Sequence, residues 1–80
     1  MEKDDKRQEL EEKLARYLKG ALKQAGVTYE GLAVELKAYG FPDETKASIA
    51  SKLGRGSFPA SFLVAVLRVA GREEIKLGDV

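Results

Sequence analysis

Residues 26–58 carry the clearest pattern in the chain and read GVTYEGLAVELKAYGFPDETKASIASKLGRGSF. Apolar side chains recur there at helical spacing in two short runs. Gly40-Phe41-Pro42 separates the two runs, and Gly54-Arg55-Gly56 follows the second. Glycine and proline are the residues that most often end helices. The pattern therefore predicts two short helices joined by a tight turn, which is the arrangement of a helix-turn-helix.

The first of these helices is expected to run from a Thr28 cap to about Tyr39, with Gly40 ending it. Threonine hydroxyls cap helix N-termini, and glycine favours the backbone conformation that ends helices. The second helix is expected to begin at Asp43 or Thr45, because either side chain can cap it. The side chains expected to face inward from the two helices are Leu32, Ala33, Leu36, Tyr39, Ile49 and Leu53.

A longer helix is expected on the N-terminal side, from near Asp5 to a stop at Gly26. A fourth helix has Pro59 in its first turn, where proline is favoured, and ends at Gly71. Apolar residues cover more than half of the fourth helix, so it is expected to be the central element of the core. The apolar stripe expected on the first helix comprises Leu10, Leu14, Leu18, Ala21, Leu22 and Ala25.

These elements together predict an all-α fold, a four-helix bundle that contains a helix-turn-helix and carries a short extended C-terminal tail. At 80 residues the chain is expected to form one domain, residues 1–80. Residues 1–4 are expected to lack fixed structure, and residues 74–80 are expected to form the extended tail.

The composition argues against several classes of function. The chain contains no histidine and no cysteine, which removes the commonest general base, the commonest metal ligand and any thiolate site. An enzyme is therefore not expected, and neither a cofactor, a metal nor a small-molecule substrate is indicated. The N-terminus MEKDDKRQEL is charged rather than apolar, and no apolar run approaches the roughly 20 residues of a membrane span. The expectation is a cytoplasmic protein without a membrane partner.

The net charge is only +1, but basic residues concentrate in two windows that contain no acid. Residues 13–29 hold four lysine or arginine residues, and residues 45–72 hold five. Acids are confined to residues 2–12, 30–44 and 73–79. A nearly neutral protein can present a basic face in this way, and phosphates respond to the local potential.

The outer side of the second helix of the pair is the candidate DNA-binding surface. Hydroxyl and amine side chains there can reach base edges or phosphates in a major groove about 12 Å wide. We expect Lys46 and Ser48 to lie nearest the bases, whereas Lys52 is expected to hold a phosphate together with Arg55. The backbone at the start of the preceding helix can accept another phosphate. The candidate residues are Thr28, Tyr29, Thr45, Lys46, Ser48, Ser51, Lys52 and Arg55.

The same region resembles the lambda-repressor-like helix-turn-helix domains. The residues that carry this resemblance are Thr28, Leu32-Ala33, Leu36, Ser48-Ile49, Leu53 and Arg55-Gly56. A closer resemblance, over about residues 13–77, is to a small, largely uncharacterised bacterial domain family. It is carried by Leu18-Lys19, Leu22-Lys23, Gly26 to Tyr29, Leu32-Ala33, Leu36, Gly40, Lys52, Arg55-Gly56, Phe58 and Phe62. The resemblance implies a bacterial source, a lambda-repressor-like four-helix bundle, and base-reading positions at Thr45, Lys46, Ser48, Ser51 and Lys52.

The expected function is therefore a DNA-binding transcriptional regulator that reads the major groove with residues 45–54. Double-stranded DNA would be its partner, together with a second copy of the chain for paired half-sites, and Val64 or residues 75–77 are candidate dimer contacts. The alternative is a protein-interaction module built on the same helical scaffold, with Tyr17, Tyr29 and Val64 as contacts. It stays open because one fold hosts many functions.

Overall fold

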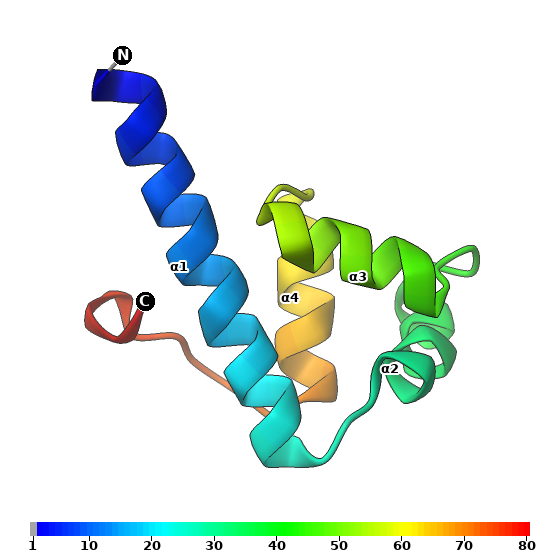
Figure 1. Ribbon diagram of the computed structural model, residues 1–80. Coiled ribbons are helices and arrows are strands. Elements are labelled where there is room, and N and C mark those ends of the chain that lie inside the picture. The colour runs from blue at the N-terminus through cyan, green and yellow to red at the C-terminus, as the bar shows by residue number, and fades with distance from the viewer. Residues whose placement is uncertain (1) are drawn as a thin grey trace.

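The structure, a computed structural model, describes residues 2–80. These residues contain four α-helices and two short 3-10 helices (Figure 1). The elements are α1 (Glu2–Ala25), α2 (Tyr29–Leu36), η1 (Lys37–Tyr39), α3 (Lys46–Arg55), α4 (Ala60–Val69) and η2 (Leu77–Asp79). No strand occurs within residues 2–80. The predictions of an all-α fold and of four helices are confirmed.

α1 forms a long rod along one side of the molecule (Figure 1). α3 and α4 pack against it, and α2 packs in turn against α3 and α4. It begins at Glu2 rather than near Asp5, and Gly26 ends it in the left-handed region with φ of 72°. The first turns of α1 project past the other helices (Figure 1). Residues 2–4, which were expected to lack fixed structure, belong to α1, whereas Met1 lies outside the described residues.

The apolar stripe of α1 is shorter than its sequence pattern suggests. Leu18, Ala21 and Leu22 are buried, together with Ala15, which the pattern did not single out. The predicted stripe is wrong at its two ends, because Leu10 is 64% exposed and Ala25 is also exposed. The stripe continues along the rod beyond the helices that could cover it, so its periodicity extends further than its burial.

The bounds predicted for the helical pair are confirmed with one refinement. Thr28 caps α2, its Oγ1 accepting a hydrogen bond from the Gly31 N–H at 3.0 Å. After Leu36 the chain tightens into η1, which ends at Gly40 with φ of 89°. A 3-10 helix has about 3.0 residues per turn instead of 3.6, which rotates the following side chains. Tyr39 is consequently 43% exposed, so the prediction that it faces inward is wrong.

α3 begins with a capping box. The Thr45 Oγ1 accepts a hydrogen bond from the Ser48 N–H at 3.1 Å, and the Ser48 Oγ accepts one from the Thr45 N–H at 2.8 Å. The helix ends at Gly56, which has φ of 68° and is buried against α1. A Cβ atom at Gly56 would overlap the backbone carbonyl of Glu11, so only glycine allows this contact.

α4 supplies the centre of the core, as predicted. The Phe62 ring is fully buried and meets Phe41 edge-on at 5.8 Å and Phe58 at 5.2 Å between ring centroids. The fully buried side chains around it come from all four α-helices and comprise Leu18, Leu22, Leu32, Leu36, Ile49, Leu53 and Val66. None of the helices within residues 2–80 combines the length and apolar character that crossing a bilayer requires.

The C-terminal tail differs from the extended segment predicted for residues 74–80. Ile75 packs against the core, but residues after it turn into η2 over Leu77–Asp79. Leu77 is 84% exposed. A single apolar anchor holds the start of the tail, and beyond it a local 3-10 turn satisfies backbone groups that an isolated extended segment would leave to water.

Candidate functional site

The two sides of α3 have opposite environments. Ile49 and Leu53 are fully buried and face the core. The exposed residues of the helix lie on the other side and comprise Lys46, Ala47, Ala50, Ser51, Gly54 and Arg55. The C-terminal tail does not cover them, because it leaves the C-terminal end of α4, crosses α1 and ends on the side of α1 away from α3 (Figure 1). We call this exposed side the outer face of α3.

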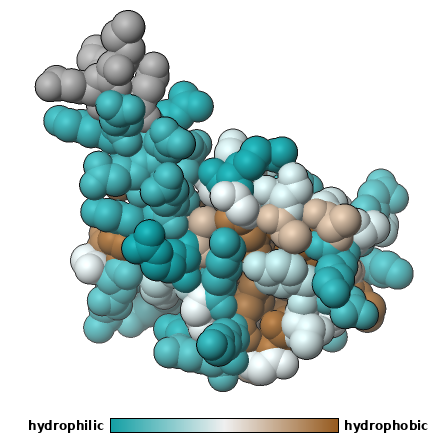
Figure 2. Space-filling view, viewed as in Figure 1, coloured by the Kyte–Doolittle hydropathy of each residue, from teal (hydrophilic) through white to brown (hydrophobic). Residues whose placement is uncertain are grey.

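Small side chains form the middle of the outer face. Ala47, Ala50, Ser51 and Gly54 carry at most two heavy side-chain atoms each, so the helix backbone lies close to the surface. The surface over α3 is tan to white in the hydropathy colouring, whereas α1 is strongly hydrophilic (Figure 2). A rigid, shallow helix surface of this kind can approach another molecule closely.

A positively charged side chain lies at each end of the outer face. Lys46 occupies the first turn and Arg55 the last, about 13 Å apart along the helix axis at 1.5 Å per residue. Arg55 Nη1 donates a hydrogen bond to Ser51 Oγ at 3.1 Å. Lys46 Nζ lies 3.7 Å from a carboxylate oxygen of Glu30. This exposed ion pair links the first turns of α2 and α3.

Ser48 and Lys52 do not belong to the outer face, which corrects the sequence-based expectation. Ser48 Oγ donates a hydrogen bond to Glu44 Oε1 at 2.6 Å, and Lys52 Nζ donates one to Glu44 Oε2. The Lys52 side chain is 28% exposed and that of Glu44 only 7%. Lys52 Nζ also lies 5.1 Å from the centroid of the Phe62 ring. Both side chains therefore tie α3 to the segment that precedes it.

Glu44 is the residue of this region that sequence reasoning missed. A signal was present, because Glu44, Ser48 and Lys52 follow one another at four-residue spacing, which places side chains on one face of a helix. Burial of the Glu44 carboxylate raises its pKa, but the hydrogen bonds from Lys52 and Ser48 and the charge of Lys52 lower the pKa further, to below its ordinary value. Glu44 is therefore an ionised anchor within the segment that connects η1 to α3.

The remaining candidate residues lie at the starts of the two helices. Thr28 and Thr45 are exposed, and each uses its hydroxyl to cap its own helix. Tyr29 is half-buried and packs against the core. The structure thus brings Lys46, Ser51 and Arg55 to one exposed face, with the two threonines as capping residues and Tyr29 as part of the packing.

Comparison with known proteins identifies a family. The sequence model of the family described as Domain of unknown function (DUF6471) matches residues 10–75. No curated protein and no solved structure matches the chain. The matched range contains α2, η1, α3 and α4 completely, together with most of α1 and the start of the tail. It includes every residue of the outer face, and it confirms the expected relationship to a small uncharacterised domain family.

Proposed function

The chain belongs to the family described as Domain of unknown function (DUF6471), and we propose that it is a DNA-binding transcriptional regulator. In this proposal α2 and α3 form a helix-turn-helix of the lambda-repressor-like kind, and α3 enters the major groove. One observation carries it: the outer face of α3 is an uncovered helix surface of small side chains between two cations, Lys46 and Arg55.

The small side chains suit direct contact with bases. Alanine methyl groups at Ala47 and Ala50 can pack on thymine methyl groups, and the Ser51 hydroxyl can donate to or accept from a base edge. Because nothing bulky stands between these side chains, the α3 backbone can lie deep in a groove about 12 Å wide.

The cations suit the phosphates on either side of that groove. Lys46 and Arg55 lie at the two ends of α3, and from there they can reach phosphates of opposite strands. The N–H groups at the start of α2, beside Thr28 and Tyr29, offer a further phosphate contact, because the positive end of the helix dipole lies there. Ser48 and Lys52 act in this proposal by holding α3 against Glu44 rather than by touching DNA.

The test starts by selecting a duplex from a random pool with the purified protein and measuring its affinity at several salt concentrations. We expect saturable binding that falls steeply with salt. Ala50→Glu places a carboxylate in the middle of the outer face and should weaken binding at least about tenfold, because like charges oppose it. Ala60→Glu is the matched control, since Ala60 is an exposed alanine at the start of α4. Absence of saturable binding at low salt, or equal effects of the two variants, would refute the proposal.

A protein-interaction module is the second candidate, and the exposed apolar side chains favour it. Val34 and Val64 are 63% and 50% exposed, and neither belongs to α3. If the duplex experiment fails, these residues mark the surface to examine.

A further inference from the structure

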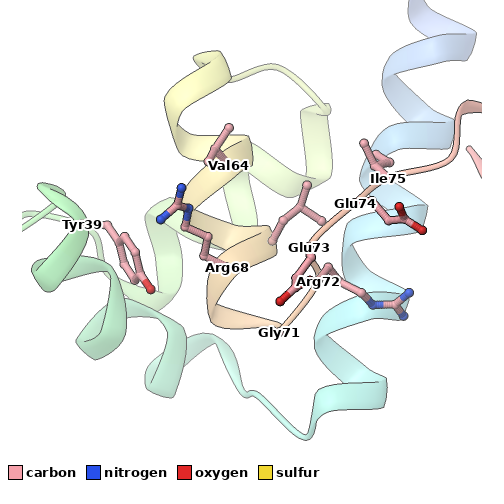
Figure 3. Close-up of a pocket in the computed structure, with 9 residues that line it drawn as sticks. Tyr39, Val64, Arg68, Gly71, Arg72, Glu73, Glu74 and Ile75 are labelled. Carbon is pink, nitrogen blue, oxygen red and sulfur yellow. The ribbon is translucent and has the colours of Figure 1, made fainter.

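A groove runs along the outer side of α4, between η1 on one side and the start of the C-terminal tail on the other (Figure 3). Its volume is about 610 Å³. Val64 and Leu67 of α4 line it together with Tyr39 of η1 and Ile75 of the tail. We call it the α4 groove.

The apolar part of the α4 groove is incompletely covered. Val64 is 50% exposed and Tyr39 43% exposed, although both are large apolar or aromatic side chains. Exposed apolar residues that gather in a hollow with a polar rim mark sites of association more often than isolated ones do. Burial of Val64 and Tyr39 against another surface would remove apolar area from water.

The charged part of the α4 groove contains both positive and negative side chains. Arg68 lies on α4 and is exposed, whereas Glu73 and Glu74 lie on the tail and are also exposed (Figure 3). Within residues 5–80 none of these three side chains makes an ion pair. Arg72 also lines the groove, but its guanidinium donates a hydrogen bond to Gln24 and lies 5.9 Å from the Tyr17 ring.

We propose that the α4 groove is the contact between two copies of this chain, related by a two-fold axis that passes beside Val64. A two-fold contact joins the same patch to itself, so it is favourable only where that patch is self-complementary. In the α4 groove the Arg68 of each copy meets Glu73 of the other, and the two Val64 side chains pack together. A negatively charged partner, such as DNA or an acidic peptide, would meet repulsion from Glu73 and Glu74.

The α4 groove is smaller than a standard interface, and interfaces below that size are usually weak. A standard interface covers about 800 Å² of each partner, whereas the chain has a total surface of 5640 Å² and the α4 groove is a small part of it. We therefore expect a weak dimer with a dissociation constant in roughly the micromolar range. No residue that lines the groove belongs to α3, so the dimer would leave both outer faces free.

The test measures the mass of the protein in solution without DNA, by sedimentation from about 1 µM to about 1 mM. The weight-average mass should rise from 8.8 kDa toward twice that value. Val64→Asp should raise the dissociation constant at least about tenfold, because it places a carboxylate at the two-fold axis. Its thermal unfolding, compared with that of the wild type, shows whether the variant remains folded. A wild-type mass that stays at 8.8 kDa throughout would overturn the proposal.

A charge exchange tests the register of the contact. Arg68→Glu and Glu73→Arg should each weaken self-association. In either variant, both of the two symmetry-related contacts would bring side chains of the same charge together. Their equimolar mixture should associate again, because both cross-contacts then pair opposite charges. Lys19→Glu and Glu12→Arg, two exposed sites on α1, form the control pair. If mixing restores nothing, or if the control pair behaves in the same way, the association uses another surface and the proposal fails. DNA binding plays no part in this readout, so the two proposals fail independently.

Discussion

Two hydroxyl–cation pairs with the same spacing lie on α3, and they have different environments. Ser48 and Lys52 are half-buried and bind the Glu44 carboxylate. Ser51 and Arg55 are exposed and contact only each other among the described hydrogen bonds. Each pair offers a hydroxyl and a positive charge four residues apart. The difference shows that the chemistry of a side chain does not decide its role, because the neighbours on its side of the helix do.

Removing each cation in turn should give the largest difference between the two pairs. Lys52→Met keeps an apolar stem over Phe62 but leaves the Glu44 carboxylate, 7% exposed, without its cation. We expect a loss of about 2 kcal/mol in the free energy of unfolding, because an unpaired buried charge retains its desolvation cost. Arg55→Met should cost less than about 0.5 kcal/mol, as is usual for an exposed position. Urea denaturation measures both.

In binding to the selected duplex, Arg55→Met should have a larger effect than Lys52→Met, which is the reverse of their order in stability. Arg55→Met is expected to lower the salt slope of binding by about 1, whereas Lys52→Met should leave the slope unchanged. The expectation from sequence alone assigned a phosphate to each of these residues. Equal losses of stability in the two variants would contradict the structural role of Lys52. A lowered salt slope for Lys52→Met would contradict the claim that Lys52 does not touch DNA.

A smaller effect is expected from the two serines. Ser48→Ala removes half of the capping box with Thr45 and one hydrogen bond to Glu44, and we expect it to cost about 1 kcal/mol. Ser51→Ala should change stability by less than about 0.5 kcal/mol, since alanine has the higher helix propensity and the site is exposed. Thermal or urea unfolding of the pair checks this. Identical unfolding midpoints would show that Ser48 is no anchor.

The smallest expected effect concerns pH. The pKa of Glu44 lies below its ordinary value because, although burial raises it, the Lys52 and Ser48 hydrogen bonds and the Lys52 charge lower it more. A depressed pKa in the folded state contributes stability above the unfolded-state pKa of about 4.3. That stability is lost as the pH falls through the folded-state pKa. Below about pH 5 the wild type should therefore lose more stability than Glu44→Gln does.

Urea midpoints at successive pH values measure this difference. Glu35→Gln, at an exposed position of α2, is the control and should retain the pH dependence of the wild type. If Glu44→Gln also retains it, Glu44 is not an ionised anchor for α3.

Much of the fold could be predicted from the sequence, because its signals are local. The threonine caps and the glycine stops act through hydrogen bonds and backbone angles within a few residues, so α2 and α3 were located to within a few positions. The sequence did not predict where the buried part of the α1 stripe begins and ends. Leu10 repeats the helical period of Leu18, yet the first turns of α1 extend past the helices that could cover it.

The candidate site was predicted less completely than the fold. Lys46, Ser51 and Arg55 lie on the exposed face as expected, whereas Ser48 and Lys52 do not. The signal for this difference was the four-residue spacing from Glu44. This spacing is informative only if the segment before α3 lies beside the helix, and the helical period of α3 does not specify the position of that segment.

The amino-acid sequence by itself determined that the chain is helical, where α2 and α3 begin, where α1 ends, and which helix is most apolar. These properties follow from interactions between residues close together in the chain. Only the tertiary structure decided that Lys52 turns to Glu44 and Phe62 while Arg55 stays in water, and that Gly56 must lie against the Glu11 carbonyl. Such choices depend on which distant segments approach one another, because burial is a property of the packed chain and not of any one helix.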